Sequence, residues 1–93
     1  MNWNSKQNKA LIEAFLTLKT PAEAQRFLRD ILTENEIEEF GKRLQTARLL
    51  TDKVPYSEIE ARTGLSSTTV ARVARWLHKG TGGYSLVLKR LKN

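Results

Sequence analysis

The sequence predicts an all-α fold of six helices, and three observations support this prediction. Apolar residues recur at spacings of three and four, the period of an amphipathic helix, and no segment alternates over the length of a strand. Serine or threonine followed three residues later by glutamate, a pattern that caps helix N-termini, occurs at three places. Glycine or proline stands where helices are expected to end. The length favours one small domain over residues 1–93.

Three helices are expected in the first half of the chain. The first covers about residues 4–18. Residues 20–23 combine a capping threonine, a proline at the first helical position and a glutamate, which together start the second helix. Residues 33–36 repeat the capping pattern and open a long third helix that stops before Pro55.

Three shorter helices follow. Ser57 starts the fourth helix through another serine–glutamate capping box, and Gly64 ends it because glycine readily adopts the left-handed conformation. Ser66 caps the fifth helix, which runs to His78. A glycine-rich breaker precedes the last helix, expected within residues 84–92.

The charge of the chain is unevenly distributed. The formal net charge is +6, yet residues 1–62 carry ten Lys and Arg against ten Asp and Glu, whereas residues 63–93 carry six Lys and Arg and no acid. A solvated helix usually mixes both signs, so a one-signed segment indicates a polyanionic partner. Nucleic acid is favoured over a membrane surface because the segment has few apolar residues and three glycines interrupt it.

Enzymatic and cofactor chemistry is not expected. The chain has no cysteine and one histidine, so it can form no disulfide, thiolate zinc site, thiol nucleophile or multi-histidine metal site. No nucleophile–base pair is recognisable, and the glycines near residue 80 follow a helix rather than a strand. No signal peptide or membrane-spanning run is evident, which predicts a cytoplasmic protein without a membrane partner.

The fourth and fifth helices together are typical of a helix-turn-helix. On the fifth, Val70, Val73, Ala74 and Leu77 form an apolar face. The other face carries hydroxyls and cations, which suits the electrostatics and width of the DNA major groove. We expect Ser57, Ser66 and Lys79 to contact phosphates, and Thr68, Thr69 and either Arg72 or Arg75 to read bases. The full set of candidate DNA-binding residues is Ser57, Ser66, Ser67, Thr68, Thr69, Arg72, Arg75 and Lys79. The alternative is that the cations of this face are merely solvated.

The stretches LTENEIEEFGKRL and TGLSSTTVARVARWL resemble the Trp repressor family, in particular its small Trp-repressor-like members of unassigned ligand. The resemblance covers Leu32 to about Leu77. It implies a six-helix Trp-repressor-like fold and an intertwined homodimer, in which residues 1–53 and the last helix form the dimer core. The helix-turn-helix, residues 56–78, would then reach successive major grooves of a near-palindromic operator, with half-sites ~34 Å apart. A transcriptional repressor of duplex DNA, associated with the nucleoid, is the function that it implies.

The family's corepressor contacts carry over only in part. Arg43 and Arg72 match the two arginines that flank the family's tryptophan ligand, whereas Val73 and Trp76 stand where the family has glycine and serine. Two larger side chains would fill volume needed by an indole ring, so we expect L-tryptophan not to be a corepressor. The candidate pocket residues are Leu32, Thr33, Arg43, Arg72, Val73 and Trp76, of which the first two match the pocket's edge. Simpler interpretations are that Trp76 belongs to the core and that Arg43 pairs with Glu39 or Glu36.

A different class of function stays open. The apolar helices could dock another protein while the basic third binds an acidic partner or RNA. The tyrosines and tryptophans are scattered rather than clustered, which disfavours RNA recognition by base stacking. The sequence specifies neither the operator nor any effector.

Overall fold

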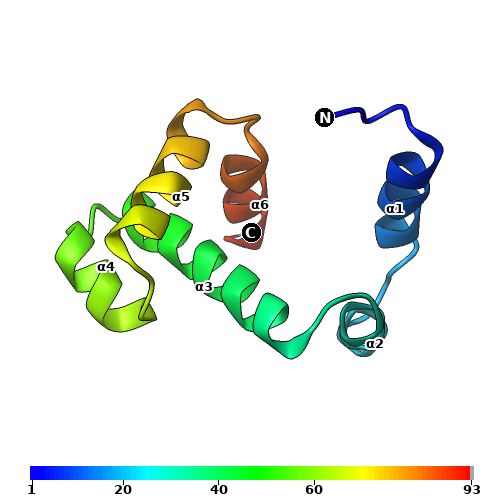
Figure 1. Cartoon of the computed structure of the whole chain (residues 1–93), viewed down its shortest axis with the longest axis horizontal. Helices are drawn as coiled ribbons and strands as arrows, with labels where there is room; N and C mark the ends of the chain where they lie inside the picture. Colours follow the sequence, from blue (N-terminus) through cyan, green and yellow to red (C-terminus); the bar gives the residue numbers. More distant parts are fainter. Residues whose placement is uncertain (93) are drawn as a thin grey trace. The chain divides into compact units, whose positions relative to one another are not determined.

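The computed structural model describes residues 1–92, and in this part of the chain the predicted six helices are confirmed, with no strand (Figure 1). They are α1 (Lys6–Leu16), α2 (Pro21–Ile31), α3 (Glu34–Thr51), α4 (Tyr56–Thr63), α5 (Ser67–Lys79) and α6 (Gly83–Leu91). Contacts group the chain into two compact units, of which the first is Met1–Glu34 and the second begins at Asn35. The single domain predicted over the whole chain stays a prediction.

The first unit contains α1 and α2, and side-chain caps define both N-termini. Ser5 Oγ accepts a hydrogen bond from the backbone N–H of Asn8 at 3.2 Å, so α1 begins later than predicted. Thr20 Oγ1 accepts from the backbone N–H of Glu23 at 3.2 Å, which confirms the predicted cap of α2. Phe15 and Phe27 join the two helices edge to face, with ring centroids 5.4 Å apart. This geometry is favourable for aromatic pairs.

The second unit is built around α3, which starts directly after Thr33 and ends before Pro55, as predicted. The predicted capping box at Ser57 is wrong. The N-cap of α4 is Pro55, which makes no side-chain cap. Its carbonyl oxygen accepts the backbone N–H groups of Glu58 and Ile59, each at 3.1 Å. The helix therefore starts at Tyr56, and Ser57 lies inside the first turn, two positions after the residue that caps it.

The turn between α4 and α5 is closed by Thr63 and Gly64. Gly64 has φ of 75°, the left-handed conformation predicted for it. Thr63 is buried, and its hydroxyl donates to the carbonyl oxygen of Ile59 at 2.7 Å while accepting the N–H of Leu65 at 3.2 Å. Ile59 and Val70 are fully buried, as expected for two helices packed across a tight turn. The helix-turn-helix is thus confirmed.

The remaining core joins α3, α5 and α6 through Ala47, Val73 and Leu88. The last helix begins at Gly83, before the residues predicted for it. Gly82 has φ of 87°, and its carbonyl oxygen accepts the backbone N–H of Leu86 at 3.0 Å, so the glycine of the breaker already serves as the N-cap. The last turn of α5 and the start of α6 are therefore close along the chain.

Candidate nucleic-acid interface

Helix α5 has the two faces that the sequence predicts. Val70, Val73, Ala74 and Leu77 are buried. Thr68, Arg72, Arg75 and Lys79 are exposed. Among residues 1–92, the ion pairs involve Arg29, Arg43 and Arg62, and none involves a cation of α5. The three cations on this helix are therefore available to an external anion.

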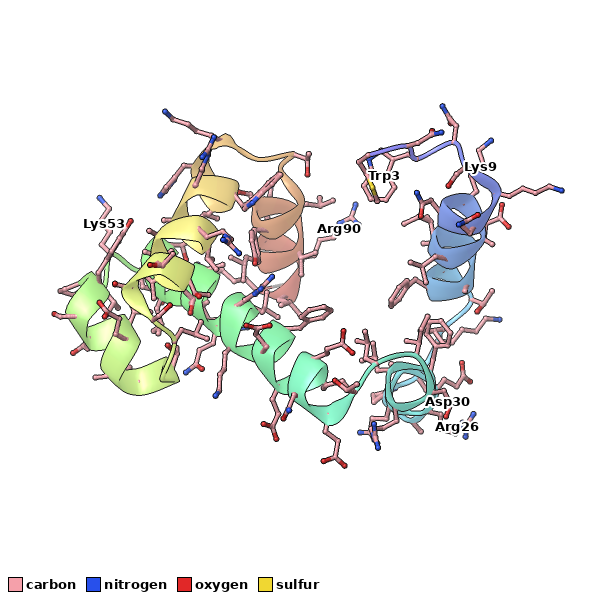
Figure 2. The ribbon with its side chains drawn as sticks, viewed as in Figure 1. Trp3, Lys9, Arg26, Asp30, Lys53 and Arg90 are labelled. Carbon is pink, nitrogen blue, oxygen red and sulfur yellow. The ribbon has the colours of Figure 1, made fainter. Side chains whose placement is uncertain are left out.

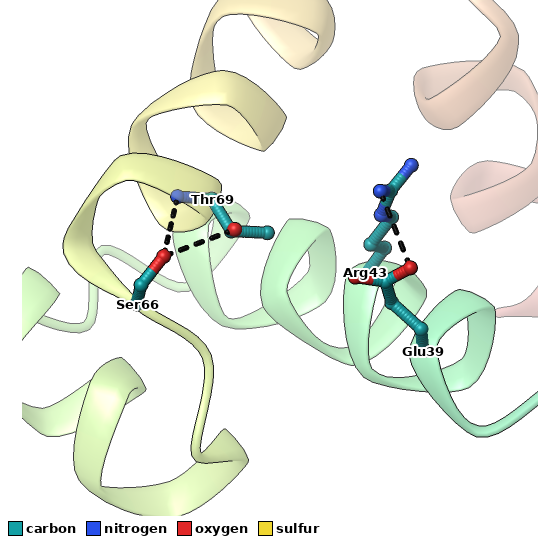
Figure 3. A network of polar contacts seen from close by, with 4 residues as sticks. All are labelled: Glu39, Arg43, Ser66 and Thr69. Atoms are coloured by element: carbon teal, nitrogen blue, oxygen red, sulfur yellow. Dashed lines mark hydrogen bonds and ion pairs between the residues drawn. The ribbon is translucent and has the colours of Figure 1, made fainter. Parts of the chain in front are cut away.

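Ser66 and Thr69 are hydrogen-bonded to each other at the N-terminal end of α5 (Figure 3). Ser66 Oγ accepts the backbone N–H of Thr69 at 3.2 Å and lies 3.1 Å from Thr69 Oγ1. A single hydroxyl hydrogen satisfies that second contact, so the pair keeps one hydroxyl hydrogen for an outside acceptor. Ser67 and Thr68 are exposed. Their backbone N–H groups lie in the first turn of the helix, where no carbonyl oxygen of the helix can accept them. This end thus presents donors and the positive end of the helix dipole.

Helix α4 contributes less. Ser57 is exposed and makes no cap, so its hydroxyl is accessible. Arg62, however, forms an exposed ion pair with Glu58 at 3.0 Å, and this pair offsets the only basic group of the helix. The net positive field of the helix-turn-helix therefore arises from α5.

Arg72, Arg75, Trp76 and Lys79 line a hollow of about 410 Å³, which we call the basic hollow. Its lining includes three cations, one indole and no carboxylate. The sequence predictions placed Trp76 with Arg72 in the candidate ligand pocket, but not with Arg75 and Lys79. The signal was present in the spacing, because Trp76 follows Arg72 by four residues and precedes Lys79 by three, which places all of them on one helix face.

A second hollow of about 520 Å³ also has Trp76 in its lining, and we call it the apolar pocket. It is lined by Arg43, Leu44, Trp76, Thr81, Gly83, Tyr84 and Val87. Sequence reasoning missed the residues of α6, whose only signal is the spacing of three between Tyr84 and Val87.

Arg43 is held on α3 by its neighbours. It pairs with Glu39 at 3.5 Å, as the simpler interpretation expected (Figure 3). Its guanidinium also lies 6.0 Å from the ring centre of Phe40. Its Nε is buried and has no hydrogen-bond partner in the described residues. A buried donor without a partner is rare in folded proteins.

The predicted ligand-pocket residues are only partly brought together. Trp76 lines both hollows, whereas Arg43 lines only the apolar pocket and Arg72 only the basic hollow. Trp76 is 55 % exposed, and the expectation that it belongs to the core is wrong for this chain. Val73 is buried in the core, where it fills space behind α5. Leu32 and Thr33 belong to the first unit.

Other cations of the acid-free segment lie outside both hollows. Arg90 on α6 extends from the helix into solvent (Figure 2). Lys53, which precedes this segment in the link between α3 and α4, is exposed as well.

No helix within residues 1–92 combines the length and apolar character required to cross a membrane. The described side chains also include no group of three or more His, Asp or Glu arranged to hold a metal ion.

Comparisons with known proteins agree with this architecture. The family model described as Trp repressor protein matches residues 6–92. YerC of Bacillus subtilis, an uncharacterized protein, is 39 % identical over 87 residues, which is 94 % of this chain and 84 % of YerC. A TrpR-like protein from Eubacterium eligens superposes with a TM-score of 0.92 at 36 % identity, covering 97 % of this chain and 93 % of that one. A candidate Trp repressor from Staphylococcus aureus gives 0.91 at 33 % identity, covering 99 % and 95 %.

Proposed function

The chain belongs to the Trp repressor family, a family of DNA-binding regulators, and from that premise we propose that it is a transcriptional repressor that recognises a specific duplex site through α5. The observation that carries the proposal is the exposed face of α5. That face joins a donor-rich N-terminus to three cations that have no carboxylate partner among residues 1–92. Duplex DNA supplies the phosphates and acceptor edges that such a face requires.

In this mechanism the N-terminal end of α5 enters the major groove first. Exposed Thr68 and the remaining hydroxyl of the Ser66–Thr69 pair reach base edges, together with Arg72 or Arg75. Ser57 and Lys79 contact phosphates and fix the register, and Ser66 contributes through the cap. The bound protein represses by occluding RNA polymerase.

We further propose that the protein binds as an intertwined homodimer in the cytoplasm, at the nucleoid. Several large apolar side chains of the described residues are exposed in the single chain, which a dimer would bury. These are Leu11, Ile12, Phe15, Leu16, Ile31, Phe40, Leu86, Val87 and Leu91. Two copies of α5 related by a two-fold axis would read half-sites ~34 Å apart on a near-palindromic operator.

The absence of a tryptophan corepressor also belongs to the proposal. Val73 occupies the core, and Trp76 lines the two hollows that contain Arg43 and Arg72. The protein's own indole thus borders both hollows that contain the arginines matching the family's ligand contacts. We therefore expect DNA binding that does not need added L-tryptophan.

The experiment is selection of bound duplexes from a random library, followed by fluorescence anisotropy on the selected duplex. The variant R72A/R75A should lose most of its affinity. The control K89A/R90A removes the same charge from α6, in the same acid-free segment, and should lose much less. Equal losses would show that net charge, rather than the α5 face, drives binding. The failure of the unaltered protein to enrich any duplex would refute the proposed function and favour an interaction module for an acidic protein or RNA.

A further inference from the structure

We propose that the basic hollow is a binding site for one phosphate of the DNA backbone, and that Arg75, Trp76 and Lys79 set the position of α5 while Arg72 is left to read a base. This inference rests on the proposed function. The N-terminal half of the α5 face, up to Arg72, would contact bases, and the C-terminal half, which includes Trp76, would contact the phosphate.

The spacing along the helix separates the two halves. With a rise of 1.5 Å per residue, Arg72 lies ~6 Å beyond Thr68 along the axis, whereas Arg75 lies ~10 Å and Lys79 ~16 Å beyond it. The major groove is ~8.5 Å deep, so a helix that enters by its N-terminal end carries Arg75 and Lys79 to the rim. The rim of the groove is where the backbone phosphates lie.

The composition of the basic hollow favours a compact anion. Its three cations repel one another, and no carboxylate lines the hollow to offset that repulsion. A phosphate bound by Arg75 and Lys79 would relieve this repulsion, including the part that acts on Arg72, and could accept hydrogen bonds from both side chains at once. Trp76 lines the same hollow, and an indole N–H is a donor only, which suits an anion.

Gly80 allows the indole to lie where it does. The backbone N–H of Gly80 bonds to the carbonyl oxygen of Trp76 at 2.9 Å and ends α5. A Cβ at position 80 would come within 2.8 Å of Trp76 Cε3 and would also meet the carbonyl oxygen of Trp76. The absent side chain therefore lets the ring pack against the end of the helix, where it lines both the basic hollow and the apolar pocket.

The test compares R75A, K79A and R75A/K79A with the unaltered chain, using the selected duplex and a scrambled duplex between 50 and 200 mM salt. Each phosphate contact changes affinity by about 3.5-fold over this fourfold range, from a slope of about −0.9 per phosphate. If both cations share one phosphate, the fall in affinity between 50 and 200 mM salt should be about 3.5-fold smaller per subunit for the double variant than for the unaltered chain. If the cations contact two separate phosphates, that fall should be about 12-fold smaller. The shared site also predicts equal affinity losses on both duplexes, because phosphates carry no sequence information. A loss confined to the selected duplex, or the larger salt effect, would overturn the inference.

Trp76 supplies an independent readout. In a W3F background it is the remaining tryptophan, and its emission should change at the same duplex concentration as the anisotropy. T68A is the matched control, which should lower affinity for the selected duplex more than for the scrambled one. Inorganic phosphate and adenosine monophosphate test a free-phosphate ligand, and saturation by either at micromolar concentration would overturn the assignment to the DNA backbone. If the unaltered chain binds no duplex, the proposed function fails. If it binds while the Trp76 emission and the salt dependence of R75A/K79A stay unchanged, only this inference fails.

Discussion

Replacing Ser66 by alanine should destabilise the protein, whereas the same change at Ser57 should not. Both serines follow a helix-start pattern in the sequence, but only Ser66 accepts a backbone N–H, that of Thr69 at 3.2 Å. Loss of a serine N-cap costs about 1 kcal/mol, within a range of roughly 0.5–2. An exposed serine that caps nothing costs within about 0.5 kcal/mol. For a chain of this size 1 kcal/mol corresponds to a fall in Tm of about 4–8 °C.

The assay is thermal and urea unfolding followed by circular dichroism at one fixed protein concentration, because a dimer's apparent stability depends on concentration. S66N and S66D keep a capping oxygen and should retain the Tm of the unaltered chain. S66D also places a negative charge at the end of α5 that is proposed to meet DNA, so it should bind duplex more weakly while S66N does not. Equal losses of stability in S57A and S66A would refute the assignment of the caps.

Other predictions follow from burial, backbone conformation and the proposed ligand independence. Ile59→Ala empties a fully buried position between α4 and α5 and should cost about 2–5 kcal/mol in urea unfolding, and a loss below 1 kcal/mol would contradict the packing. Gly64→Ala should lower the free energy of unfolding by roughly 1–2 kcal/mol because φ is 75° at that position. Gly41→Ala, inside α3 with open space around it, should raise the free energy of unfolding by up to about 1 kcal/mol. A stabilising Gly64→Ala together with a destabilising Gly41→Ala would be inconsistent with the structure. Calorimetric titration with L-tryptophan should give no saturable heat, and micromolar binding would show that Trp76 leaves room for the ligand.

The sequence predicted the elements that depend on local chemistry. Thr20 and Ser66 cap helices because a β-hydroxyl three residues before a free N–H can accept it, whatever the rest of the fold does. Gly64 adopts the left-handed conformation for an equally local reason. Ser57 was misassigned because the same pattern was offset by Pro55, whose carbonyl oxygen had already started the helix. The serine–glutamate spacing alone does not show that a neighbouring residue, here Pro55, already begins the helix.

The candidate site was predictable in its exposed part and less so in its hollows. The two faces of α5 follow from helical spacing, so the exposed cations were identified correctly as a set. The apolar pocket depends on where α6 packs. Three of the four residues from Gly80 to Gly83 are glycines, so the sequence does not predict the direction in which α6 leaves this link. Trp76 was expected to be buried because large aromatic residues usually are, yet it ends on the exposed face beside the cations.

The most direct test of the central claim uses the absence of cysteine from the chain, which allows a single reactive thiol to be introduced. A DNA-cleaving iron chelate attached at T68C, on the first turn of α5, should cut the selected duplex at two positions about one helical turn apart. The same reagent at E38C, on the acidic part of α3, should cut weakly or not at all. Equal cutting from both positions, or none from position 68 on a duplex that is bound, would contradict the claim that α5 lies in the groove.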